Sequence, residues 1–429
     1  MDKSAWTLLA IFVSTIAGLI LEPLPVGAWS FVAATLTLVT RTLNFTDLFA
    51  AFTNDVIWLI VVSFFFAKGF EKCGLGQRVA NIFVKLFGKS TLGLAYGLGV
   101  AEIMVAPAMP STTARAGGIF VPIISSLSQS AGSMPNEPSR KRLGSYLIQA
   151  QLQGSASSSA LYLTAAAQNL LCMKLAAEAG VAIPSTWATW FKAASVPALV
   201  SVFLTPLVMY KIFPPELKST PDAPKMAARK LEEMGPMSRD ERVMLSTMGV
   251  AVLLWVFGER LGVSAVATSM MGLCALLLSG VLTWQDCVTH SSAWDTLFWF
   301  AVLVSMSAQL NARGVISYFA GTIGQRLVAA NLGWPAAFAL LNVSYFALHY
   351  MFASQVAGVP PVMGALSLSW MSNLMGSLTH FGSGQAAVYF GAGYISLKEM
   401  FASGAIAAVM NLAIWGIVGS MWWRWIGLI

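Results

Sequence analysis

Apolar runs of helix length follow one another along most of the chain, and charged residues rarely interrupt them. A helix that crosses the hydrocarbon core of a membrane needs about 20 predominantly apolar residues. Only 10% of the residues are charged, whereas soluble domains carry about 25%. The sequence therefore predicts an all-α polytopic membrane protein and excludes a soluble enzyme, a nucleic-acid-binding domain and a disordered chain.

The runs predict roughly ten or eleven membrane spans, together with pieces that enter the membrane without crossing it. The runs of helix length are 5–21, 25–41, 55–70, 91–108, 143–172, 189–212, 243–258, 261–283, 292–308, 333–352 and 401–420. Two stretches that polar residues interrupt lie at 110–131 and 357–394.

A charged segment divides the chain into two halves. Residues 213–242 hold several prolines and an equal number of acidic and basic residues, which predicts a solvent-exposed linker with a short surface helix at its centre. We expect residues 1–212 and 243–429 to form two membrane repeats. Asp295 follows Asp55 by 240 residues in similar contexts, and Gly314 follows Gly74 by the same 240. Many secondary transporters are built from such a duplication.

The first polar run within an apolar region spans Pro110–Gly118 and contains Ser111, Thr112, Thr113 and Arg115. Irregular backbone survives at membrane depth only where it lines a cavity or packs inside protein. The run therefore predicts a re-entrant hairpin near 105–131 with hydroxyl groups at its tip. A surface loop between two ordinary helices is the alternative.

The second polar run ends in Gln168 and Asn169, whose amides demand hydrogen-bond partners. The second half has matching elements: Ser354 and Gln355 correspond to the first hairpin tip, and Thr379, Ser383 and Gln385 correspond to the region of Gln168. We expect Gln168 and Gln385 to face each other across a pseudo-two-fold centre.

Arg115 is the ionisable residue of most interest, because a guanidinium beside a hairpin tip can hold a carboxylate with two hydrogen bonds. Snorkelling of its side chain to the membrane interface is the alternative. Glu102 precedes the hairpin and is a candidate ion-pair partner. His349 and His380 are candidates for a proton relay or for packing roles.

Four motifs resemble the divalent anion/sodium symporter family, and within it the plastid dicarboxylate translocators. They are Pro110–Gly118, Ala165–Cys172, Ser292–Asp295 and Gly384–Tyr394. The resemblance implies an inverted-repeat fold with two re-entrant hairpins, a homodimer in membrane lipid, and exchange of small dicarboxylates, with malate against glutamate or 2-oxoglutarate. It also implies a plastid inner envelope location, with a bacterial plasma membrane as the alternative.

The first tip of the family reads Ser-Asn-Thr, whereas this chain has Ser111, Thr112 and Thr113. Thr112 lacks the amide oxygen that could ligate sodium, so the resemblance does not extend to sodium coupling. We expect no cofactor and no metal. Arg115 would supply fixed positive charge instead.

The second half departs from the family after its hairpin tip. Gln168 follows Ser111 by 57 residues, whereas Gln385 follows Ser354 by 31, which is 26 fewer. We interpret the difference as a missing return arm of the second hairpin. This feature keeps a second hypothesis open, namely a non-transporting remnant or interaction protein. A third, an intramembrane enzyme using His349, His380 and an aspartate, lacks any paired catalytic motif.

Overall fold

The computed structural model describes residues 3–21, 23–178, 180–315, 318, 361–380 and 382–428. Within these ranges the chain is helical, and its only β pairing is an isolated bridge between Ser90 and Ser219. The all-α fold class predicted from the sequence is confirmed. The predicted site residues Ser354 and Gln355, and the histidine His349, lie outside the described residues.

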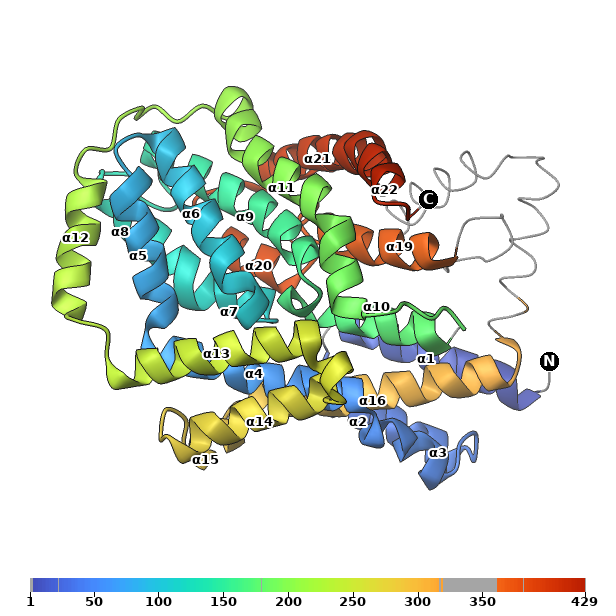
Figure 1. Cartoon of the computed structure of the whole chain (residues 1–429). Coiled ribbons are helices and arrows are strands. Elements are labelled where there is room, and N and C mark those ends of the chain that lie inside the picture. Colours follow the sequence, from blue (N-terminus) through green and yellow to red (C-terminus); the bar gives the residue numbers. More distant parts are fainter. Residues whose placement is uncertain are drawn as a thin grey trace.

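The long helices form two bundles that lie side by side (Figure 1). The α4 bundle, low in the view, consists of α1 (Lys3–Leu21), α2 (Val26–Val39), α4 (Asp55–Cys73), α13 (Arg239–Phe257), α14 (Ala265–Leu278) and α16 (Ser291–Ala312). The α9 bundle consists of α6 (Thr91–Val105), α9 (Gly144–Leu161), α11 (Thr186–Ile212), α19 (Pro361–Met375), α21 (Leu397–Ala413) and α22 (Ser420–Trp425). Shorter helices are α3 (Phe45–Phe49), α5 (Leu75–Phe87), α7 (Thr112–Arg115), α8 (Val121–Ser130), α10 (Ala167–Glu178), α12 (Ala223–Met234), α15 (Trp284–Val288) and α20 (Gly384–Gly391).

Matching helices of the two halves make matching contacts. Helices α2 and α14 have 14 residues each, and α2 packs on α16 while α14 packs on α4. In the same way α10 packs on α19, and α20 packs on α9. Each helix thus packs on a long helix of the other half, which is the arrangement expected of two intertwined repeats. These contacts support the predicted duplication, whose division at 213–242 stays a prediction.

The glycines that marked the repeat in the sequence end corresponding helices. Gly74 follows α4 with φ 76°, and Gly314 lies two residues after the end of α16 with φ 75°. Only glycine adopts this left-handed conformation without a steric cost, so it stops a helix and turns the chain. The start of α4 is also determined by a neighbouring residue. The Asn54 side chain caps the helix by accepting a hydrogen bond from the amide of Val56.

Four helical segments of the described chain are long and apolar enough to cross a membrane, and a bent pair, Phe45–Thr53 with Asp55–Cys73, makes a fifth. This number counts only the described residues, and the predicted span 333–352 lies outside them. Within the described residues several apolar runs form helices too short or too polar to be counted as spans. Helices α2 and α14 have only 14 residues, and α9 carries polar side chains along its length. Large apolar side chains on the outer surface, such as Leu278 and Val39, suit contact with lipid.

Most residues of the charged segment 213–242 are exposed, and the segment contains a short helix, α12, that packs against the rest of the protein. Helix α12 lies along α5 at the left edge of Figure 1 and buries Ala223 and Ala227. The residues before α12 contact the start of α6, where the Thr91 amide donates to the Lys218 carbonyl at 3.1 Å. Helix α13 already begins at Arg239, three residues before the predicted end of the segment.

A buried ion pair fixes the end of this segment. The Arg78 guanidinium in α5 donates to both carboxylate oxygens of Glu241, with N–O distances of 2.5 and 3.0 Å, and to the carbonyl of Gly235 at 2.9 Å. Burial raises the pKa of Glu241, but hydrogen bonds from Arg78 and Ser238 outweigh this effect and hold the pKa below its ordinary value. The pair therefore stabilises the fold above the ordinary glutamate pKa of about 4.3, and this contribution is lost as the pH falls.

We predict that Glu241→Gln lowers the free energy of unfolding by about 3 kcal/mol at neutral pH, because it leaves the buried Arg78 charge unpaired. Thermal unfolding in detergent measures the effect, and the loss should shrink below about pH 4. Lys230→Ala is the control, since Lys230 pairs with Glu233 on the exposed face of α12. Equal melting temperatures for both variants would contradict the assigned role.

Candidate functional site

The polar run after α6 breaks the helix, as predicted. Pro107 lies in a 3-10 turn, Ala106–Ala108, and the backbone becomes regular again only after Ser111. The Ser111 hydroxyl accepts a hydrogen bond from the amide of Ala114 at 3.1 Å and so caps α7. Residues 112–130 then continue as α7, a π turn and α8. The break thus presents a helix N-terminus inside the protein.

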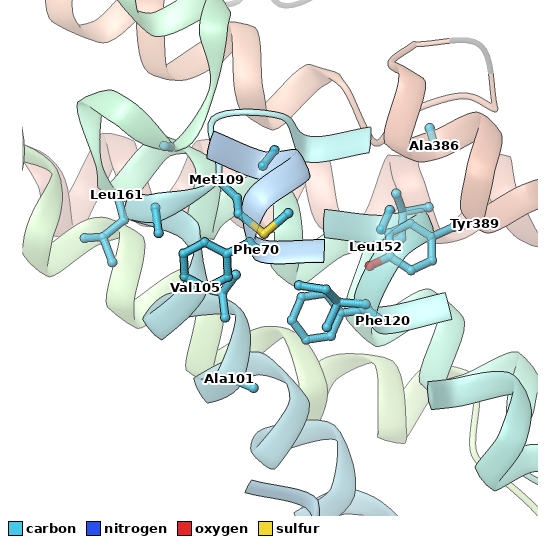
Figure 2. Close-up of a cluster of buried hydrophobic side chains, with 14 of the residues drawn as sticks. Phe70, Ala101, Val105, Met109, Phe120, Leu152, Leu161, Ala386 and Tyr389 are labelled. Atoms are coloured by element: carbon cyan, nitrogen blue, oxygen red, sulfur yellow. The ribbon is translucent and has the colours of Figure 1, made fainter. Parts of the chain in front are cut away.

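A second break, between α9 and α10, packs against the first. The chain leaves α9 at Leu161, passes through a 3-10 turn at Leu163–Ala165 and enters α10 at Ala167. The hydroxyl of Thr164 donates to the carbonyl of Pro107 at 3.0 Å. Figure 2 shows Val105 and Met109, before and within the first break, close to Leu161 at the end of α9. Both breaks are thus built into the buried core.

Arg115 joins the two breaks. Its guanidinium donates to the carbonyl of Met109 in the first break and to that of Ala165 in the second, the latter at 2.7 Å. A third bond reaches the hydroxyl of Ser159 at 2.7 Å, near the end of α9. A fourth reaches Glu102 at 3.1 Å. Neither side chain of this ion pair is more than 1% exposed, so the candidate pairing of Glu102 with Arg115 is confirmed.

These contacts change the interpretation of Arg115. Four hydrogen bonds to protein acceptors occupy most of its donors, and the Glu102 carboxylate balances its charge. Its side chain is also fully buried, so it does not snorkel to the interface. In this conformation Arg115 orders the backbone around the two breaks, and the helix N-termini there are a second source of positive potential for an anion.

Glu102 extends the network to the second half of the chain. Its other oxygen accepts a hydrogen bond from the Gln151 amide, and the Ser155 hydroxyl lies 2.7 Å from the first oxygen. The same hydroxyl lies 2.9 Å from the side-chain oxygen of Gln385 in α20. One hydroxyl proton serves only one of these two acceptors. Gln385 is thus tied to α9.

Gln168 and Asn169 pair with a residue that the sequence analysis missed. The Gln168 amide donates to the side-chain oxygen of Asn373 in α19 at 3.1 Å, and the Asn373 amide donates to that of Asn169 at 2.7 Å. Gln168 and Gln385 therefore bond to opposite halves, but to Asn373 and Ser155 rather than to each other. The signal for Asn373 was its position inside a mainly apolar helix without charged residues, where an amide needs a partner.

The N-terminus of α20 meets that of α7. Ser383 caps α20 by accepting from the amide of Ala386 at 3.3 Å, and its hydroxyl donates to the carbonyl of Gly376 at 2.7 Å. Gly384 lies so close to Thr113 that an added Cβ would be 2.3 Å from the Thr113 hydroxyl. Glycine is therefore required here by close approach.

Several of the predicted site residues are thus brought together around the N-termini of α7 and α20. Thr113 and Gly384 are exposed, and Ser111, Thr112, Thr379 and Ser383 are half-buried, so hydroxyl groups line an open polar surface. Thr379 lies in the turn before α20, where its carbonyl accepts from the amide of Gly382 at 3.2 Å. His380, one residue later, packs against the rings of Phe390 and Phe401.

A separate cavity of about 440 Å³ does not fit an anion. Leu59, Trp187 and Trp255 are among its mainly apolar lining, and none of the described residues that line it is charged. An anion in it would lose hydration without a compensating charge. The hydroxyl surface at Thr113 and Gly384 is therefore the better candidate for a site.

We predict that Glu102→Gln destabilises the protein by about 3–5 kcal/mol, because it leaves the Arg115 charge buried without its counterion. Arg115→Met should cost a similar amount, whereas the double variant should cost clearly less than the two single changes together. Chemical or thermal unfolding of the four proteins in detergent measures this coupling. Additive effects would contradict the central place of the pair.

Comparison with known proteins identifies one family, and the three relatives described here share one kind of name. The family model described as the sodium:sulfate symporter transmembrane region matches residues 1–429. A spinach protein named dicarboxylate transporter 2, chloroplastic, is 58% identical over 100% of this chain and 79% of its own length. Arabidopsis dicarboxylate transporter 2.1, chloroplastic, is 56% identical over 96% and 76% of the two chains. Spinach dicarboxylate transporter 1, chloroplastic, is 45% identical over 100% and 78%.

The alignment with the first relative runs over 444 positions, which is 15 more than the 429 residues of this chain. That relative therefore carries at least 15 residues without a counterpart here. The family match nevertheless extends over the whole length, which argues against a remnant. The chain belongs to the sodium:sulfate symporter transmembrane family.

Proposed function

We propose that this chain is a secondary transporter that exchanges small dicarboxylates by alternating access, with malate against glutamate or 2-oxoglutarate. The observation that carries the proposal is the meeting of the α7 and α20 N-termini at Thr113 and Gly384. Free amide groups and the helix dipole make such ends favourable for carboxylates. The relatives are named as dicarboxylate transporters and not as enzymes, which disfavours an intramembrane enzyme.

Two helix ends suit a substrate with two carboxylates. Each N-terminus carries a partial positive charge of about one half, so two of them offset much of the charge of a carboxylate pair. Thr112 and Thr113 add hydroxyl donors at one end, and Ser383 and Thr379 add polar groups at the other. Hydroxyls bind carboxylates without adding net charge, which allows the substrate to be released again. We place Gln168, Asn169 and Gln385 behind this surface, where their hydrogen bonds hold the helix ends.

Arg115 supports this site from behind. It holds the carbonyls of both breaks, so the adjacent helix N-termini keep a fixed direction. A preorganised set of dipoles stabilises an anion without the free-energy cost of reorienting those dipoles during binding. This role replaces direct bidentate binding of the substrate by Arg115.

We also propose that exchange does not require sodium. Thr112 stands where the family has an asparagine, so the first tip lacks an amide oxygen as a sodium ligand. We place the protein, as a homodimer in lipid, in a plastid envelope membrane, because the three plant relatives described above are named chloroplastic. Dimerisation and the inner membrane follow from the family resemblance alone.

Labelled-malate counterflow in proteoliposomes tests the substrate site. We predict that Thr113→Val raises the half-saturating malate concentration about ten-fold or more, because a hydrogen bond to a carboxylate is lost. Thr35→Val is the matched control, since Thr35 is an exposed threonine in α2 whose hydroxyl donates to Phe31. An unchanged malate affinity in a folded Thr113→Val protein would remove this surface from the site.

The sodium proposal has its own test in the same vesicles. Replacing sodium by N-methylglucamine on both sides should leave the initial rate of malate exchange unchanged, since no ligand set for the ion is complete at the first tip. A rate that falls several-fold without sodium would show that the family's coupling persists in this chain.

A further inference from the structure

Three helices of the α9 bundle run beside one another around a buried polar region that the substrate site does not use. Gln153 in α9 donates to the carbonyl of Ser377, just after α19, at 3.1 Å. An added Cβ on Gly404 in α21 would lie 2.4 Å from the carbonyl of Leu378. These contacts bring α9, the end of α19 and α21 together at one level.

About two turns away the three helices are joined by a fourth, α11. The indole of Trp190 in α11 donates to the carbonyl of Ala160 in α9 and packs on the ring of Trp370 in α19, with ring centroids 5.8 Å apart. The Trp370 ring also packs on Trp415, just after α21, at 5.1 Å. Ser157 in α9 and Asn411 in α21 are fully buried and lie between these two levels. Asn411 shares a helix face with Gly404 and Trp415, from which it is seven and four residues away.

Polar atoms between the two levels lack partners among the residues that the structure describes. They are the Gln153 side-chain oxygen, the Ser157 hydroxyl, both side-chain polar atoms of Asn411, and the indole nitrogens of Trp370 and Trp415. Each of these residues is at most 2% exposed. Buried polar groups are almost always hydrogen-bonded, and each exception costs about 1–3 kcal/mol. Bound groups that satisfy these atoms are therefore expected.

We propose that this seam between α9, α19 and α21 binds a cluster of ordered water molecules inside the membrane-embedded bundle. The set combines acceptors, on Gln153 and Asn411, with donors, on Asn411, Trp370 and Trp415. Water satisfies both kinds, whereas a metal cation would satisfy the oxygens and repel the N–H groups. Exchanging the two ends of the Asn411 amide changes nothing, because both lack a partner.

Radiolytic hydroxyl-radical labelling of the whole protein in detergent tests this directly, because bound water generates radicals beside buried side chains. We expect Trp415 to be oxidised several-fold faster than its burial allows, and Asn411→Leu to slow that oxidation. Tyr146 is the buried control on α9, since its hydroxyl donates to the Pro206 carbonyl. Oxidation of Trp415 at the low rate of a dry buried side chain would overturn the proposal.

Thermal unfolding gives a second and independent readout. If water satisfies Asn411, Asn411→Leu removes hydrogen bonds that the seam shares, and the melting temperature falls. In a dry seam the same change removes an unpaired amide, so a higher melting temperature would contradict the proposal. Ser403→Ala is the control, because that buried hydroxyl already donates to the Met400 carbonyl. If Asn411→Leu does not fold, the labelling of the unaltered chain still decides.

Discussion

The buried ion pair between Glu102 and Arg115 is the interaction on which the centre of this structure depends. Taking both charges out of water is costly, and their attraction offsets that cost only when further hydrogen bonds satisfy both groups. Here the carbonyls of Met109 and Ala165 and the hydroxyl of Ser159 accept hydrogen bonds from the guanidinium. The carboxylate has further hydrogen-bond partners in the amide of Gln151 and the hydroxyl of Ser155. The pair is therefore the point at which two broken helices are held together.

Broken helices explain how a polar site exists within an apolar bundle. A break frees amide groups that a continuous helix would satisfy, and lipid cannot bind them. At Ser111 and Ser383 a side-chain hydroxyl caps part of each new end. The remaining amides and the helix dipole are available to an anion. In our proposal the first break therefore also forms part of the binding surface, and the same holds for the start of α20.

The sequence predicted the fold class, the first break and the need of the Gln168 and Asn169 amides for hydrogen-bond partners, because each of these leaves a local signal. Polar residues in an apolar run need partners, and proline interrupts a helix. The partners themselves were harder to predict. Asn373 was missed because its contacts join α10 to α19 across 204 residues, and no local pattern reports that distance. The sequence suggested that Arg115 binds the substrate, because its two carbonyl acceptors belong to the backbone and backbone contacts cannot be inferred from residue types.

The sequence also predicted the spacing between the two repeats only in part. An offset of 240 residues relates Gly74 to Gly314, but 217 relates the starts of α10 and α20, at Ala167 and Gly384. The difference of 23 residues falls between Gly314 and Gly384, and most of that stretch, residues 319–360, lies outside the described ranges. The missing return arm therefore stays a prediction.

A structure with bound malate, determined by cryo-electron microscopy in lipid nanodiscs, tests the central claim most directly. The account predicts carboxylate density beside Thr113 and the N-terminus of α20, with Arg115 still bonded to Glu102. Density that places a substrate carboxylate on the Arg115 guanidinium, with Glu102 released from it, would contradict the account.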